Sequence, residues 1–556
     1  MLTNPLAITL FFIMCMALLA PSKCFGAGLT YWVTHGTTRV KPDVAPADNK
    51  AVAIKAAKNE YEPFQVILRS QENLRKADVV VSDLVGANGR QIGKENIALF
   101  REHYIYVRMP SSRCDNPPGW YPDALIPFVN PVTGERVQTK DARFVAAPFD
   151  IWKGINQVIW VDVFAPKDTT AGDYAGHLTV TVDGEEALRI PINLTVWDFA
   201  LPDIPSVQAD FGSYNRVARW HDMDAGSEEF RQIELRYCQA MAAHRICPMI
   251  PSYLHPKPNP DGSISTEETH AQLRDFIETM RVNSFRIRFG TRYPYPDPLG
   301  EDRDKAIRYL RNLYDYLDAN GWAEMSYTYI IDEPNDAEAY DRVRAFAQLL
   351  HEAHPKLKFL CTEQTKTQNP DWGDFYGYVD IWVPLWPLHD EENAQGRLNA
   401  GDELWSYTAL CQGKEPSPFW QLDFPVLNYR IPMWGSWRYQ MTGLLYWSVV
   451  YWDRVKDPWL DQLTIYGRYN GDGSLLYPGA DAGIDGPVAS IRLKNIREGM
   501  EDYEYFKILA DLGDERFVDD QVRELFQTWF SWEKNPDRLM ETRERLAQKI
   551  LELYEE

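Results

Sequence analysis

The chain has 556 residues, a formal charge of −22 at neutral pH and an isoelectric point near 5.0. This length exceeds one ordinary hydrophobic core and predicts two or three domains. The acidic balance argues against nucleic acid or an anionic membrane surface as a partner. Aromatic residues make up 13% of the chain, with 19 Trp and 30 Tyr. Exposed aromatic faces can hold the apolar faces of sugar rings, although most of these side chains are expected in the core.

The first 27 residues are typical of a secretory signal peptide. Leu6 to Ala20 is apolar, and small residues follow it up to Ala27. This apolar stretch is shorter than the roughly 20 residues that span a bilayer. We therefore predict that residues 1–27 are a signal peptide and that the protein is secreted or periplasmic, without a stable membrane insertion after cleavage.

Residues 28–200 alternate apolar and polar side chains in short runs that Gly, Pro and Asp turns separate, which predicts a β-sandwich. Examples are Phe64–Leu68, Gln157–Val163 and His177–Val182. The Pro-rich segment Leu201–Pro205 is predicted to be a linker.

From residue 206 to residue 512 strand patterns alternate with helical ones, which predicts a closed (β/α)8 TIM barrel with Ile491–Ala510 as the final helix of its outer ring. Residues 513–556 are predicted to be a charged helical extension that covers the barrel. The eight strand candidates are Val207–Tyr214, Cys247–Leu254, Ser284–Phe289, Ser326–Ile331, Lys358–Thr362, Val379–Leu385, Leu404–Thr408 and Gly443–Tyr451.

The fourth strand candidate ends in two adjacent carboxylates, Asp332 and Glu333. In a barrel the carboxyl ends of the strands open onto the catalytic face, so this pair is a candidate catalytic site. The alternative is that acids between Asp332 and Asp336 cap the following helix.

Strand seven lacks the second carboxylate that many retaining barrel glycosidases place at its end. It finishes in Trp405-Ser-Tyr-Thr408, and its acids Asp402 and Glu403 lie at the opposite end. Two adjacent acids without a separate nucleophile fit a substrate-assisted scheme, in which the 2-acetamido group of the sugar attacks its own anomeric carbon. Glu333 would then be the general acid and base, and Asp332 would orient the acetamide.

Eight segments spread over most of the mature chain resemble one known family: Asn59–Gln65, Gly119–Pro127, Ala171–Gly176, Asp332–Pro334, Leu444–Trp452, Asp457–Trp459, Gly471–Gly479 and Ser490–Gly499. Through these segments the chain resembles glycoside hydrolase family 123. The resemblance implies a β-sandwich plus (β/α)8 barrel and the exo-acting release of β-linked N-acetylgalactosamine (GalNAc) by substrate-assisted retention, with the family's Asp-Glu pair at Asp332 and Glu333.

Further residues are candidates for substrate binding. Tyr407 can donate to the acetamide carbonyl as the oxazoline forms, or merely pack at the barrel mouth. Glu363 is the alternative second carboxylate, or a salt-bridge partner. The aromatic candidates for walls of a sugar pocket, some of them expected in the core, are Trp386, Trp405, Tyr446, Trp447 and Trp452.

A Gly-rich loop after strand eight carries Asp472 and Tyr477, which can bind sugar hydroxyls or simply form a turn. The histidines show no metal-ligand spacing, so no metal and no cofactor is expected.

The leading hypothesis is a glycosidase that acts on terminal N-acetylhexosamine. A barrel glycosidase of other specificity that uses Glu333 with Glu363 is the alternative within enzymes. A non-catalytic carbohydrate-binding or scaffold protein is the alternative from another class.

Overall fold

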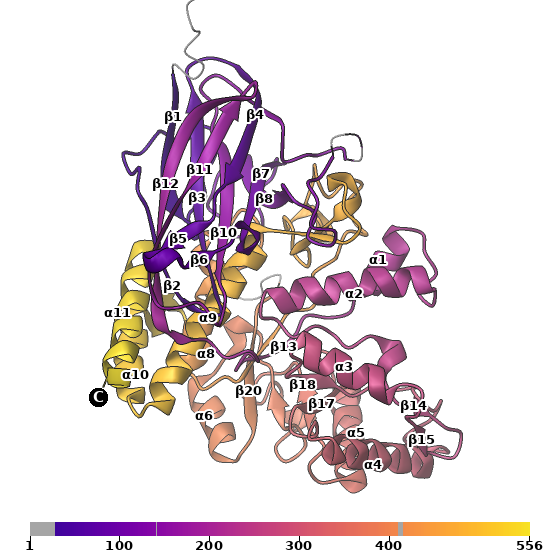
Figure 1. The fold of residues 1–556 in the computed structure, drawn as a ribbon. Helices are drawn as coiled ribbons and strands as arrows, with labels where there is room; N and C mark the ends of the chain where they lie inside the picture. The colour runs from indigo at the N-terminus through magenta and orange to yellow at the C-terminus, as the bar shows by residue number, and fades with distance from the viewer. Residues whose placement is uncertain (1–27, 139, 141, 410–414, 556) are drawn as a thin grey trace, which may run out of the picture.

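The computed structural model describes residues 28–138, 140, 142–409 and 415–555. The predicted signal peptide lies outside these residues. A β-rich N-terminal part stands on an α/β part, and the C-terminal helices run alongside both (Figure 1). Within the described residues, no helix is both long and apolar enough to cross a membrane.

Two sheets form the N-terminal part. The five-stranded sheet is antiparallel, with the order β1 (Leu29–His35), β3 (Glu60–Ser70), β10 (Gln157–Ala165), β7 (Ile97–Val107) and β8 (Gly119–Pro127). The main path of the seven-stranded sheet is β2 (Val52–Lys58), β12 (Glu185–Ala200), β11 (Gly172–Val182), β4 (Leu74–Val81) and β9 (Phe149–Ile151), with β5 (Leu84–Gly86) and β6 (Gln91–Ile92) beside it.

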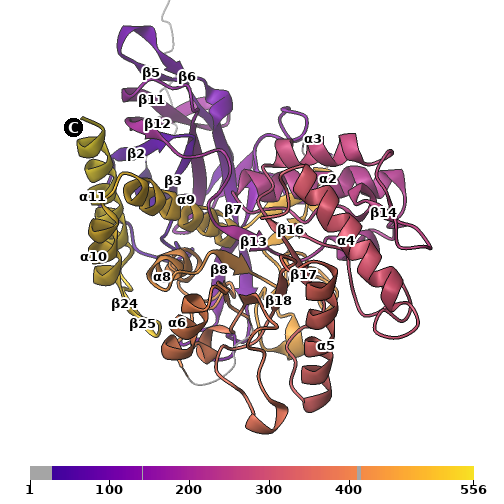
Figure 2. The same cartoon turned by 90° about the horizontal axis from the view of Figure 1, so that it is seen from below.

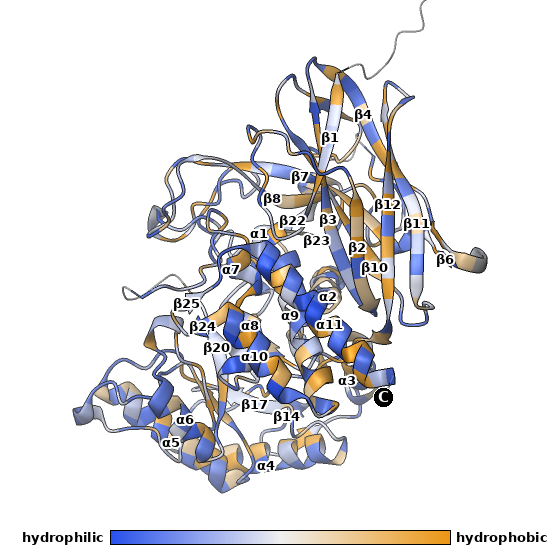
Figure 3. Cartoon of the chain, turned by 90° about the vertical axis from the view of Figure 1, so that its left-hand side faces the viewer, coloured by the Kyte–Doolittle hydropathy of each residue, from blue (hydrophilic) through white to orange (hydrophobic). Residues whose placement is uncertain are grey.

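Side chains from both sheets share one hydrophobic core. Phe64, Val66 and Leu68 alternate along β3 and meet Val180 of β11 and Ile192 of β12. Period-two alternation places every second side chain on the same face of a strand, so the alternation in the sequence builds this core. Figure 3 shows the resulting change between hydrophilic and hydrophobic residues along the strands.

A parallel sheet of seven strands forms the centre of the second part. Its order is β13 (Gln208–Asp210), β21 (Gly443–Leu445), β20 (Glu403–Tyr407), β19 (Ile381–Trp382), β18 (Phe359–Cys361), β17 (Ser326–Tyr329) and β16 (Phe285–Arg286).

The second expected strand, Cys247–Leu254, is absent from this sheet in the described structure, so hydrogen bonds do not close the expected eight-stranded ring between β13 and β16. Pro248 and Pro251 explain the difference, because proline has no N–H to donate to a ladder. The segment still lies against the sheet edge, where the Cys247 thiol contacts the Ser284 carbonyl oxygen at 3.5 Å.

Helices cover the parallel strands. The helix after β17 begins where Asp336 accepts a hydrogen bond from the Ala339 N–H at 2.8 Å, as expected of an N-cap. The helices up to β21 are α1 (Asn215–Trp220), α2 (Glu228–Ala243), α3 (His270–Met280), α4 (Arg303–Ala319), α5 (Ala337–Ala353), α6 (Glu391–Asn399), α7 (Leu427–Arg430) and α8 (Pro432–Arg438).

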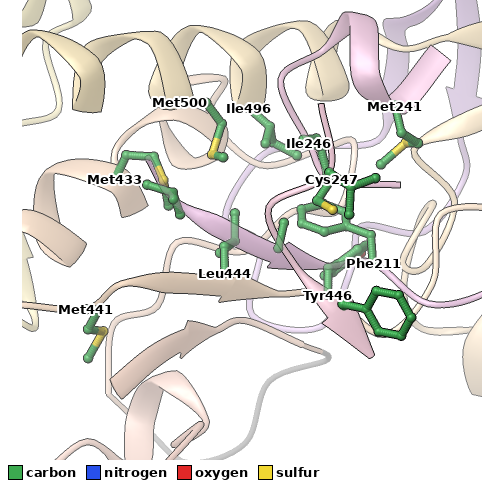
Figure 4. Close-up of a cluster of buried hydrophobic side chains, with 14 of the residues drawn as sticks. Phe211, Met241, Ile246, Cys247, Met433, Met441, Leu444, Tyr446, Ile496 and Met500 are labelled. Atoms are coloured by element: carbon green, nitrogen blue, oxygen red, sulfur yellow. The ribbon is translucent and has the colours of Figure 1, made fainter. Parts of the chain in front are cut away.

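Helix α9 (Ile491–Asp511) is buried on nearly all sides, although it was expected on the outside of a barrel. It contacts α7 and α8 of the second part and β8 and β3 of the first. Figure 4 shows its Ile496 and Met500 in one buried cluster with Met433 of α8 and Leu444 of β21.

The C-terminal extension consists of α10 (Glu515–Leu525), the hairpin strands β24 (Phe526–Thr528) and β25 (Ser531–Trp532), and α11 (Pro536–Glu555). Figure 2 shows α8 to α11 gathered on one side of the parallel strands and α2 to α5 on the other. The extension does not cover the α/β part alone, because α11 also contacts β12.

Buried ion pairs join α9 to the N-terminal part. Arg492 pairs with Asp123 of β8 at 2.8 Å, and both side chains are 0% exposed. Arg497 and Lys494 pair with Asp162 of β10 at 3.0 and 2.6 Å. Burial alone would raise the pKa of Asp162, but these two cations hold it well below its usual range.

We predict that Arg492→Met lowers the free energy of unfolding by about 3–5 kcal/mol, because it leaves the Asp123 carboxylate buried without its cation. Urea unfolding measures this loss. The matched control is Arg303→Met, which breaks the exposed pair of Arg303 with Glu352 and should cost about 1 kcal/mol or less. Equal losses in the two variants would contradict the prediction.

Candidate functional site

Asp332 and Glu333 lie in the six-residue segment, residues 330–335, between β17 and the N-cap of α5. Asp336 is the residue that caps this helix. The capping interpretation therefore explains Asp336 and leaves Asp332 and Glu333 without that role.

Two hydroxyl groups hold the Asp332 carboxylate. Tyr329 Oη donates to Asp332 Oδ1 at 2.5 Å, and Thr362 Oγ1 donates to the same oxygen at 2.7 Å. Tyr329 belongs to β17, and Thr362 directly follows β18, the neighbouring strand. With both donors on one oxygen, the second oxygen of Asp332 accepts no hydrogen bond from the residues that the structure describes.

Glu333 adopts a backbone conformation that is uncommon for a residue with a side chain, with φ of 41°. Such conformations persist where the surrounding contacts enforce them, and they concentrate at functional sites. The side chain reaches Tyr407 at the end of β20, whose hydroxyl donates to Glu333 Oε1 at 3.3 Å. Burial and the Asp332 carboxylate raise the pKa of Glu333, and the Tyr407 hydrogen bond opposes them.

A pocket of about 330 Å³ opens beside these residues. Asp332 and Tyr407 lie on its wall. The Tyr407 side chain belongs to one hydrophobic cluster with Trp405, Tyr327 and Leu445 of the neighbouring strands. The other lining residues are Asp210, Gly212, Ser213, Arg216, Arg286, Tyr329, Ile330, Leu445, Tyr446, Trp447 and Ser448.

Asp210 and Arg286 belong to the site but were not among the predicted residues. Asp210 ends β13 and accepts a hydrogen bond from Tyr327 Oη at 2.8 Å, and Arg286 Nη1 lies 3.5 Å from its carboxylate. The Arg286 guanidinium also lies 4.6 Å from the centre of the Tyr329 ring. The expected strand Val207–Tyr214 placed Asp210 in its interior, so the strand-end signal that identified Asp332 did not mark Asp210.

Trp447 forms another wall of the pocket. Its indole N–H donates to Asp472 Oδ2 at 3.0 Å. Gly473 allows this packing, because a Cβ there would lie 2.3 Å from the indole and its φ is +72°. Asp472 itself is fully buried, and burial raises its pKa to about 6 against hydrogen bonds from Gln421 and Trp447. Asp472 therefore positions Trp447 rather than contacting a sugar.

Three of the five aromatic wall candidates, Trp386, Trp405 and Trp452, lie in the core, and so does Tyr477, which was predicted to bind sugar hydroxyls. Trp386 stacks on Trp529 at 3.9 Å, Trp452 donates to the Leu476 carbonyl, and Tyr477 donates to Asp123 at 2.6 Å. Trp405 is fully buried beneath Tyr407. Sequence could not distinguish these rings from exposed ones, because their partners come from distant segments. Tyr446 lines the pocket, but its hydroxyl accepts a bond from the Gly473 N–H at 2.9 Å.

Glu363 follows Thr362 and is 5% exposed. Burial raises its pKa to about 7, and hydrogen bonds from the Gln364 N–H and Tyr340 oppose the rise. It is absent from the pocket lining. Within the described ranges, this site included, no cluster of three or more His, Cys, Asp or Glu side chains could hold a metal ion.

Two family models match the sequence. The model described as "Glycoside hydrolase 123, catalytic domain" matches residues 182–509, and "Glycoside hydrolase 123 N-terminal domain" matches residues 37–182. No curated protein matches the chain.

Among solved structures, a family 123 glycoside hydrolase from Clostridium perfringens, described in a study of glycolipid glycan hydrolysis, aligns with a TM-score of 0.67 and 15% identity. The alignment covers 94% of this chain and 97% of that one. A family 39 glycoside hydrolase from Bacteroides cellulosilyticus aligns with a TM-score of 0.33 and 12% identity, over 81% of each chain.

We predict that Asp332→Asn lowers the pKa of Glu333, because it removes one of the two causes that raise it. The titration of labelled glutamate side chains by NMR measures the shift. Asp341→Asn on α5 is the control and should leave the Glu333 titration unchanged. An unchanged or higher Glu333 pKa in Asp332→Asn would show that the two carboxylates do not interact.

Proposed function

Because the chain belongs to glycoside hydrolase family 123, we propose that it is a glycosidase that releases terminal N-acetylhexosamine by substrate-assisted, retaining catalysis. Of the N-acetylhexosamines, we propose β-linked GalNAc, since the sequence resemblance implies it. The predicted signal peptide supports a further proposal, that the enzyme meets its glycan in the periplasm or outside the cell.

The observation that carries this proposal is the arrangement of Asp332 and Glu333. Asp332 has one oxygen held by Tyr329 and Thr362 and the other left for a ligand. Glu333 has a raised pKa and contacts Tyr407. One fixed carboxylate beside a carboxyl group whose pKa is raised suits the two roles that acetamide participation requires.

In the first step Glu333 donates its proton to the glycosidic oxygen, and the bond from the anomeric carbon to that oxygen breaks. The acetamide carbonyl oxygen forms the new bond to the anomeric carbon, and the acetamide N–H gains positive character. The free oxygen of Asp332 accepts that N–H, which stabilises the developing charge at short range. Before this transfer Glu333 carries its proton and does not need the Tyr407 hydrogen bond, so the Tyr407 hydroxyl can donate to the acetamide carbonyl oxygen of the bound substrate and orient it.

In the second step a water molecule attacks the anomeric carbon and reopens the oxazoline ring. Glu333, now a carboxylate, accepts the proton of that water. Two displacements at one carbon return the sugar with its original configuration. Trp447 supplies an apolar wall for the sugar ring in both steps.

Glu363 is a weaker candidate for a protein nucleophile, because a nucleophilic carboxylate must be ionised and accessible. With a pKa of about 7 it is partly protonated at neutral pH, and it is only 5% exposed. A non-catalytic carbohydrate-binding protein would have no use for the raised pKa of Glu333, which favours the enzyme over that alternative.

We predict that Glu333→Gln lowers kcat for a disaccharide with a poor leaving group by about 100- to 10,000-fold, while an activated aryl glycoside loses less. Steady-state kinetics on both substrates measure the difference. Glu338→Gln, on the exposed face of α5, is the matched control and should hydrolyse both at the wild-type rate. Undiminished disaccharide turnover by Glu333→Gln would remove this residue from the mechanism.

A further inference from the structure

Thr362, which directly follows β18, contacts both carboxylate residues of the site. Its hydroxyl donates to Asp332 Oδ1 at 2.7 Å and accepts a hydrogen bond from the Glu333 backbone N–H at 2.8 Å. The residue is 5% exposed, so water has little access to replace either bond.

The hydrogen-bonding capacity of a threonine hydroxyl matches these contacts. It has one proton and two lone pairs. The proton is used on Asp332, one lone pair receives the Glu333 N–H, and Tyr329 Oη lies 3.4 Å away on the remaining side. Removal of the hydroxyl would therefore leave both Asp332 and the Glu333 backbone short of a partner.

The bond to Glu333 bears on its unusual backbone. With φ of 41°, the peptide places the side chain of Glu333 toward Tyr407 and its N–H toward the next strand. Non-glycine residues leave this region readily unless a contact holds them. The Thr362 oxygen is the hydrogen-bond partner of that N–H.

We infer that the Thr362 hydroxyl is a positioning group that sets both carboxylates at once, the Asp332 side chain directly and the Glu333 side chain through its backbone. This inference rests on the proposed function. It also explains how Asp332 and Glu333, although adjacent, keep two different orientations. A single hydroxyl at the end of the neighbouring strand β18 donates to one residue and accepts from the other, and so fixes them relative to each other.

A purely structural role for Thr362 predicts a change in stability alone, so the test needs readouts specific to each carboxylate. For Glu333 that readout is the dependence of kcat on the leaving group. For Asp332 it is inhibition by a cyclic thiazoline mimic of the oxazoline, which contacts the acetamide site and needs no proton donation.

The test compares Thr362→Val, which has nearly the same shape without the hydroxyl, with Thr362→Ser, which retains it. We expect the Val variant to lose about 10- to 100-fold in kcat, the range that a hydrogen bond to a charged group supports. The loss should be larger for a disaccharide than for an activated aryl glycoside, and thiazoline inhibition should weaken. The Ser variant should restore both readouts.

Thr365→Val is the matched control. Thr365 is also buried, three residues along the same loop, and its hydroxyl has no hydrogen-bond partner. This variant should keep wild-type kinetics and inhibition. If the Val variant at position 362 does not fold, Thr362→Ala against Thr362→Ser provides the same comparison.

Wild-type values of kcat and thiazoline inhibition in a folded Thr362→Val enzyme would overturn the inference and leave the proposed function standing. Equal losses in Thr362→Ser and Thr362→Val would also overturn it, because the hydroxyl would not be the cause. If the wild-type protein hydrolyses no 2-acetamido glycoside, the proposed function fails and the inference fails with it.

Discussion

The charged, buried helix α9 is the constraint on which the arrangement of this protein depends. Its Arg492, Lys494 and Arg497 reach carboxylates of the N-terminal sheet, and its Asp502 accepts a bidentate pair of hydrogen bonds from Arg430 of α7. Buried charges are strongly unfavourable unless they are paired and hydrogen-bonded. The two parts of the chain can therefore bury this helix only in a relative position that satisfies its charges together.

The same interface reaches the pocket. Arg492 donates to the carbonyl oxygen of Gly471 at 2.7 Å as well as to Asp123. Asp472, the next residue, accepts the indole N–H of Trp447 on the pocket wall. A run of hydrogen bonds thus connects β8 of the N-terminal part to the surface that a sugar would contact. This connection gives the N-terminal sheets a role in the site without a pocket residue of their own.

Sequence reasoning could predict the features that local pattern determines. The multidomain organisation, seven of the eight strands expected in the parallel sheet and the position of Asp332 and Glu333 shortly after a strand all followed from apolar runs and from the residues that end those runs. The expected strand that is absent, Cys247–Leu254, contains two prolines. Their effect on strand pairing is also local, so the sequence could have predicted its absence. The burial of α9 could not be predicted, because its charged side chains are typical of a solvated helix until their partners on β8 and β10 are known.

The pocket residues also divide into those that local sequence could predict and those that depend on distant parts of the chain. Tyr407 and Trp447 were identified because they are aromatic residues at or near strand ends, whereas Thr362 has no chemical signature of its own. Its importance comes from the register between β17 and β18, which places its hydroxyl between Asp332 and Glu333. Trp386 failed as a candidate for the converse reason, since the surface it would offer a sugar is covered by Trp529 from a segment 143 residues away.

The central claim is that the acetamide of the substrate, and not a carboxylate of the protein, attacks the anomeric carbon. Mass spectrometry after incubation with an activated 2-fluoro glycoside tests it most directly, in a preparation whose turnover of a 2-acetamido aryl glycoside proves the site intact. The account predicts that the protein keeps its unmodified mass. A labelled peptide that contains Glu363, Asp210 or any other carboxylate would reveal a covalent glycosyl-enzyme and contradict the account.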